Sequence, residues 1–170
     1  MQTSTIKLYS LEYGNSKTYL VASLFILGNI LLPQICHLFP MGGVRWLPIY
    51  FFTLIGAYKY GWRVGLLTAI MSPLVNSAFF GMPAVAALPA IMLKSTLLAG
   101  IAGYVAARFN KVSMLLLAAV VLAYQLAGTL GEWLMGATTY NAFQDFRIGI
   151  PGILTQILGG WAVINFLLKK

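Results

Sequence analysis

The chain has 170 residues, of which 60% are hydrophobic and only 8% are charged. Soluble domains carry about 25% charged residues, so this composition excludes an ordinary soluble domain and indicates a membrane protein. The net charge of +8 is compatible with nucleic-acid binding, but the Lys and Arg residues stand in small groups at the ends of apolar segments. That placement is typical of membrane topology and argues against nucleic acid as a partner.

Six apolar segments follow one another along the chain. A helix needs about 20 apolar residues to cross the hydrocarbon core of a bilayer. We expect one helix in each segment, at approximately residues 18–38, 44–58, 62–80, 84–109, 112–136 and 148–168. The second segment is the shortest. The predicted fold is therefore an all-α integral membrane protein, a six-helix bundle that forms one domain over residues 1–170.

The distribution of cations predicts the orientation in the membrane, because Lys and Arg accumulate on the cytoplasmic side. With a cytoplasmic N-terminus, Arg45 and Arg147 lie outside and Lys94 lies within the membrane. The inner side then receives eight of the 11 cations, namely Lys7, Lys17, Lys59, Arg63, Arg108, Lys111, Lys169 and Lys170. We therefore expect both termini inside (N-in/C-in) and outer connections at residues 37–46, 79–83 and 137–147.

Lys94 is a cation deep inside an apolar segment, where an ionisable side chain is costly unless it is paired or faces a cavity. Glu132 is the one acidic residue inside any of the apolar segments. The topology puts both in the outer half of the bilayer, so we expect them to form an ion pair. Two interpretations remain open. The pair only fixes two helices together, or it belongs to a pocket that binds a polar ligand.

Further polar and aromatic residues fall in the same outer half and complete the candidate ligand site. They are Asn76, Gln125, Trp133, Tyr140, Arg147 and Gln156, together with His37, Arg45 and Trp46 of the first outer connection. Ligand pockets combine apolar walls with a few convergent polar groups. The amide side chains can equally be hydrogen bonds between helices, and the tryptophans can be interfacial aromatics. Pro73 and Pro89 are expected to bend the third and fourth helices near this cluster.

The neighbouring residues Cys36 and His37 offer soft metal ligands. The chain has one Cys and one His, so it cannot complete a structural zinc site from these residue types. Axial coordination of a metal carried by a substrate remains open. The sequence contains no zinc-protease, serine-hydrolase or phosphate-loop motif. We therefore expect no enzymatic activity, no cofactor and no ATP hydrolysis in this chain.

Two stretches carry a resemblance to a known family. They are LPIYFFTLIGAYKYGWRVGLLTAIMSPLVNSAFFGMP, residues 47–83, and LKSTLLAGIAGYVAAR, residues 93–108. They resemble the substrate-binding S components of energy-coupling factor (ECF) vitamin transporters. The resemblance implies a vitamin pocket on the outer side, capped by residues 37–46, and a partner transmembrane coupling subunit with two cytoplasmic ATPases. Many members carry an alanine ladder on the first helix for docking, whereas segment 18–38 has only Ala22, Ser23 and Gly28.

The expected function is thus capture of a vitamin or related micronutrient at the outer face of a bacterial or archaeal cytoplasmic membrane, for ATP-driven uptake by partner subunits. Lys94, Arg45 and Arg147 favour an anionic ligand. The alternative is a membrane assembly or interaction subunit without a ligand, in which Lys94 and Glu132 form only a structural ion pair. The missing ladder leaves open whether the coupling module is shared or dedicated, or whether the chain acts alone as a binding subunit.

Overall fold

The computed structural model describes residues 7–167, and within that range the chain forms helices and no β-strand. Four of its helices are long and apolar enough to cross a membrane: α1 (Ser16–Cys36), α4 (Trp62–Phe80), α5 (Leu88–Phe109) and α6 (Met114–Leu134). The prediction of an all-α membrane protein is confirmed at this level. Residue 168 of the last predicted helix and the predicted inner cations Lys169 and Lys170 lie outside the described residues.

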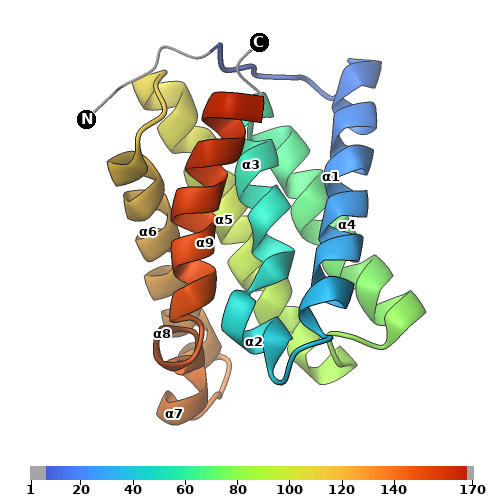
Figure 1. The fold of residues 1–170 in the computed structure, drawn as a ribbon, viewed down its shortest axis with the longest axis vertical. Coiled ribbons are helices and arrows are strands. Elements are labelled where there is room, and N and C mark those ends of the chain that lie inside the picture. Colours follow the sequence, from blue (N-terminus) through green and yellow to red (C-terminus); the bar gives the residue numbers. More distant parts are fainter. Residues whose placement is uncertain (1–6, 168–170) are drawn as a thin grey trace.

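The shorter helices are α3 (Phe51–Tyr60) and α9 (Ile150–Ala162), which continues into the π-helical turn η3 (Val163–Leu167). The helix α3 lies inside the bundle and packs against α1, α4, α5 and α9 (Figure 1). Its residues 53–59 are all buried. Because neighbouring helices surround α3, its 10 residues do not have to match the thickness of a bilayer as a lipid-facing helix would.

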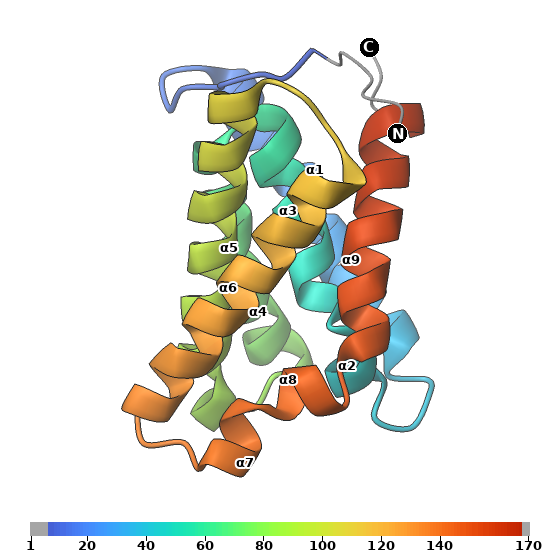
Figure 2. The same ribbon diagram turned by 90° about the vertical axis from the view of Figure 1, so that its left-hand side faces the viewer.

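The two ends of the bundle differ in construction. The start of α1 and the end of η3 lie at one end, together with the connections from α3 to α4 and from α5 to α6 (Figures 1 and 2). The other end carries three short helices, α2 (Gly42–Trp46), α7 (Thr139–Ala142) and α8 (Gln144–Arg147). The connections that we expected to be outer loops are therefore partly helical.

The second predicted helix, 44–58, is not continuous. Its first part is α2, and the chain then adopts a left-handed conformation at Leu47 (φ +48°) before the turn η1 (Pro48–Tyr50) and α3. Proline disfavours the helical conformation of the residue before it, so Pro48 accounts for the break. Pro89 also acts differently from the prediction. It lies in the first turn of α5, where its missing N–H costs no hydrogen bond, and so begins the helix rather than bending it.

A polar clamp joins α1, α3 and α4 inside the bundle. Pro33 lies within α1 and cannot donate to the carbonyl of Asn29, one turn earlier. The buried side-chain amide of Asn76 on α4 donates to that carbonyl at 2.9 Å. The Asn29 side chain in turn accepts from the backbone N–H of Phe52 at 3.2 Å and donates to Thr53 Oγ1 at 3.0 Å. The clamp thus satisfies backbone groups that the helices themselves leave unpaired.

Replacing Asn76 by alanine should destabilise the bundle, because the Asn29 carbonyl loses its partner. We expect Asn76→Ala to lower the free energy of unfolding by about 1–2 kcal/mol, measured by denaturant titration in detergent micelles. Asn141→Ala is the matched control, since Asn141 is exposed, and should change stability by less than about 0.5 kcal/mol. Equal losses in the two variants would contradict this role of Asn76.

Candidate ligand-binding site

A cavity of about 710 Å³ lies at the end of the bundle that carries α2 and α8. Its walls come from residues 37–44, residues 47–50, residues 82–84 and the start of α5. Most lining side chains are apolar, and the polar ones are His37, Lys94, Glu132, Gln144 and Asp145. Small-molecule sites have volumes of about 300–1,000 Å³ and this same mixture of apolar walls and a few polar groups.

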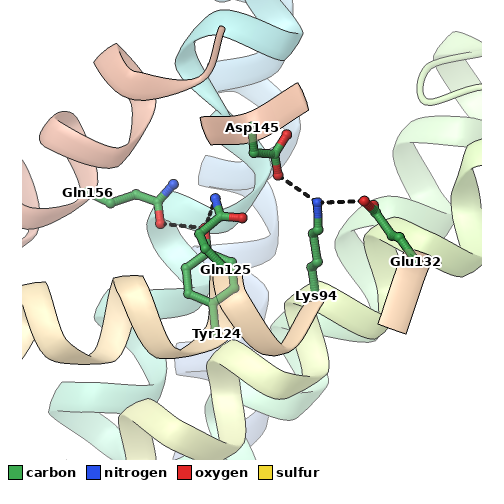
Figure 3. A network of polar contacts seen from close by, with 6 residues as sticks. All are labelled: Lys94, Tyr124, Gln125, Glu132, Asp145 and Gln156. Atoms are coloured by element: carbon green, nitrogen blue, oxygen red, sulfur yellow. Dashed lines mark hydrogen bonds and ion pairs between the residues drawn. The ribbon is translucent and has the colours of Figure 1, made fainter. Parts of the chain in front are cut away.

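Lys94 forms the centre of the polar wall. Its Nζ atom lies 2.8 Å from Asp145 Oδ2 and 3.0 Å from Glu132 Oε2 (Figure 3). The three side chains come from α5, α8 and α6, so a single ammonium group joins three elements. The predicted pair of Lys94 and Glu132 is present, and Asp145 adds a second carboxylate. Two of the three acidic residues of the whole chain therefore meet at this lysine.

The local sequence makes room for the lysine. Its aliphatic stem passes α6 at Gly128, where a Cβ atom would lie only 2.5 Å from Lys94 Cγ. After α6 ends at Leu134, the chain turns back through α7 and α8, and this return buries Asp145. A glycine on α6 and a folded-back connection are thus both required to bring the two carboxylates to Lys94.

A second polar layer lies deeper in the bundle (Figure 3). The Tyr124 hydroxyl donates to Gln156 Oε1 at 2.8 Å and accepts from Gln125 Nε2 at 3.0 Å. All three side chains are buried, and none of them lines the cavity. Gln125 and Gln156 therefore link α6 to α9 through Tyr124, which corresponds to the interhelical interpretation of these amides.

The remaining candidate residues divide between the cavity and other places. His37 lines the cavity, and its Nδ1 atom lies 2.6 Å from the Pro33 carbonyl. Asn76 belongs to the clamp described above. Trp133 is 53% exposed and does not line the cavity. The structure thus places His37 in the wall of the same cavity as Lys94 and Glu132, whereas Asn76 and Trp133 are not part of that wall.

The two outer arginines also lie away from the cavity lining. The Arg147 guanidinium stacks on the Tyr140 ring, 3.5 Å from its centroid, and donates to the Tyr140 carbonyl at 3.2 Å. Arg45 and Trp46 line a separate hollow of about 420 Å³ beside Cys36. Among the residues that the structure describes, Lys94 is therefore the lysine or arginine that lines the main cavity.

The connection that follows α1, residues 37–46, contributes residues 37–44 to the cavity wall, and two glycines fix its path. A Cβ atom on Gly42 would lie 1.8 Å from the Cys36 carbonyl oxygen, so the chain turns back on the end of α1 at this point. A Cβ atom on Gly152 would lie 2.5 Å from the Trp46 carbonyl group, so α9 packs directly against the backbone of α2. This connection is the segment that we expected to cap the pocket.

Sequence reasoning missed Asp145 as a site residue. It lies in a segment that we expected to be a loop, and its helix α8 has only four residues, too few to show a periodic pattern. The sequence did contain one clue to this role, because acidic residues are rare in the chain. In a chain with three acidic residues, an acidic residue in an outer connection was a candidate partner for a buried lysine.

Metal ligation is not supported by a cluster of side chains. Within residues 7–167, no group of three or more His, Cys, Asp and Glu residues is placed to hold a metal ion. Cys36 borders the smaller hollow and His37 borders the main cavity, so the two neighbours face different spaces. Coordination of a metal-bearing substrate by either residue stays a prediction.

Fold and site together define a class: an all-α membrane protein with a cavity at one end and a buried ion cluster in its wall. The chain shows no significant match to any known family model, curated protein or solved structure.

The passage of Lys94 beside Gly128 gives a direct test of how the cluster is held. Gly128→Ala should lower the unfolding temperature, because the added methyl group displaces the lysine stem from its position between the two carboxylates. Gly100→Ala is the matched control, since nothing lies within 4 Å of a Cβ atom at that site. The control should be neutral or stabilising, because alanine favours a helix over glycine by about 1 kcal/mol. Equal unfolding temperatures for the two variants would contradict the packing described here.

Proposed function

We propose that the protein is the substrate-binding subunit of an ECF-type transporter, which captures a vitamin-sized molecule at the outer face of the membrane. The observation that carries this proposal is the cavity of about 710 Å³ with Lys94, Glu132 and Asp145 in its wall. The resemblance in residues 47–83 and 93–108 supports the same class.

The ion cluster supports a binding site over a purely structural clamp. A clamp is most stable when it is fully enclosed and all of its hydrogen-bonding groups are satisfied. Here the three charged side chains border a cavity large enough for a ligand. Apolar walls with one group of charged side chains are the usual composition of a small-molecule site.

The proposed topology has six membrane helices with both termini in the cytoplasm. In this arrangement α3 and the α9–η3 segment complete the bundle with the four long helices, and the cavity opens to the outside. Of the described residues, the inner side would then carry Lys7, Lys17, Lys59, Arg63, Arg108 and Lys111, in keeping with the distribution of cations in membrane proteins. The chain has no nucleotide-binding motif, so energy would come from partner subunits, a transmembrane coupling subunit and two cytoplasmic ATPases.

The alternative is an assembly subunit that binds no ligand. One observation favours it: Lys94 contacts carboxylates from both α6 and α8, and so links three elements as a structural clamp would. The two functions differ in what happens when the cavity is filled. Filling the cavity abolishes ligand binding but leaves the clamp and any assembly role unchanged.

Ala90 offers such a variant, because it lines the cavity one helical turn from Lys94 on α5. We expect the protein, purified in mild detergent, to carry a bound small molecule detectable by native mass spectrometry. Ala90→Trp should lose that molecule at an unchanged unfolding temperature, because the indole occupies the cavity and leaves every charge in place. Lys94→Ala should lose it as well.

Ala107→Trp is the control, since Ala107 lies on the same helix, is exposed and is not part of the cavity wall. It should retain the molecule. Retention of the bound molecule by Ala90→Trp would contradict the proposed site. Absence of any bound molecule from the original protein would favour the assembly role.

A further inference from the structure

We propose that the cavity selects a cationic ligand, an organic molecule with a protonated amine on an apolar body. This inference rests on the proposed function and reverses the anionic ligand that the sequence suggested. The anionic expectation depended on Lys94, Arg45 and Arg147 acting together. Neither arginine lines the cavity. Two of the three cations on which the anionic expectation depended are therefore absent from the site.

The charge of the site follows from its lining residues. Within the part of the chain that the structure describes, the titratable side chains of the cavity wall are His37, Lys94, Glu132 and Asp145, together with the Tyr50 phenol. The formal charges of Glu132, Asp145 and Lys94 sum to −1. A cationic ligand brings this buried group to neutrality, whereas an anionic ligand raises the imbalance to −2.

The exposed fractions of the three charged side chains also favour a cationic ligand. The Lys94 side chain is 3% exposed, whereas the Glu132 and Asp145 side chains are 15% and 10% exposed. The ammonium group is thus covered by the protein, and the carboxylates are the more open charges. Lys94 contacts one oxygen of each carboxylate. Each carboxylate has a second oxygen, so a ligand ammonium can be bound by two acceptors without breaking the Lys94 contacts.

His37 lies in the same wall, and its ring is held between two segments of the chain. The Pro33 carbonyl can only accept a hydrogen bond, so the 2.6 Å contact requires a proton on His37 Nδ1. The Nε2 atom lies beside Gly43, where a Cβ atom would come within 2.8 Å of it. The acceptors that the wall offers a ligand are therefore the carboxylate oxygens of Glu132 and Asp145, and they fit a ligand that donates.

The rest of the wall fits an apolar body. Leu47, Ile49 and Ile91 line the cavity together with the rings of Phe39 and Tyr50. Aromatic faces attract cations by about 0.5–2 kcal/mol, so a ring beside the carboxylates favours an ammonium ligand further. The inferred ligand therefore combines an amine at the carboxylates with an apolar or aromatic part along this wall.

Three indole compounds of the same shape and different charge test the inference. They are tryptamine, a cation, indole-3-propionamide, which is neutral, and indole-3-propionate, an anion. Binding to the purified protein is measured by isothermal titration calorimetry in detergent. We expect tryptamine to bind at least about tenfold more tightly than indole-3-propionate, which corresponds to about 1.4 kcal/mol. Ala90→Trp should abolish tryptamine binding, since the cavity is then filled.

Asp145→Asn keeps an oxygen for Lys94 and removes one negative charge from the cavity, so the preference for tryptamine over indole-3-propionate should fall toward one. Glu12→Gln is the matched control, because Glu12 is the acidic residue outside the cavity and is exposed. It should keep the full preference. If Asp145→Asn does not fold, Glu132→Gln makes the same test from α6.

The outcomes separate the two proposals. Equal or tighter binding of indole-3-propionate in the cavity overturns the cationic ligand and leaves the binding function intact. Tryptamine binding that survives Ala90→Trp overturns the cationic ligand as well, because the amine then binds elsewhere. Binding of none of the three compounds overturns the inferred amine on an apolar body and leaves the proposed function to be decided by the molecule detected in native mass spectrometry.

Discussion

The end of the bundle that carries α2, α7 and α8 depends on one buried ammonium group. A charge inside a membrane protein is costly unless it is paired, and Lys94 is paired with Glu132 and Asp145 at 3.0 and 2.8 Å. Satisfying it requires α6 to approach α5 closely at Gly128 and the chain after α6 to fold back through α7 and α8. The position of the cavity wall therefore follows from the requirement that the buried Lys94 ammonium group be paired.

Two other groups of buried polar side chains also form partnerships inside the bundle, but neither borders the cavity. In the clamp, Asn76 provides the donor that Pro33 cannot provide to the Asn29 carbonyl. In the deeper layer, Tyr124 links amides on α6 and α9. Polar groups in an apolar interior are stable when they are hydrogen-bonded. The Lys94 cluster differs from these two groups because its charged side chains border a cavity.

The sequence predicted the class of fold and the centre of the site from strong, local signals. Long apolar segments indicated the four long helices, and an isolated lysine with one acid in an apolar segment indicated the Lys94–Glu132 pair. The missed features depend on distant parts of the chain. Asp145 reaches Lys94 through two four-residue helices, and Asn76 pairs with a carbonyl 47 residues away. Neither contact leaves a periodic pattern in the sequence, because each arises from tertiary packing.

The central claim is that Lys94 and Asp145 form a coupled pair that holds together the end of the bundle with α2, α7 and α8. A double-mutant cycle with Lys94→Met, Asp145→Asn and the double variant measures that coupling directly through free energies of unfolding in detergent micelles. We predict a coupling energy of at least about 1.5 kcal/mol, because Lys94→Met leaves the buried Asp145 carboxylate without its cation and Asp145→Asn removes one of the two carboxylates that Lys94 contacts. Additive effects within about 0.5 kcal/mol would contradict the claim.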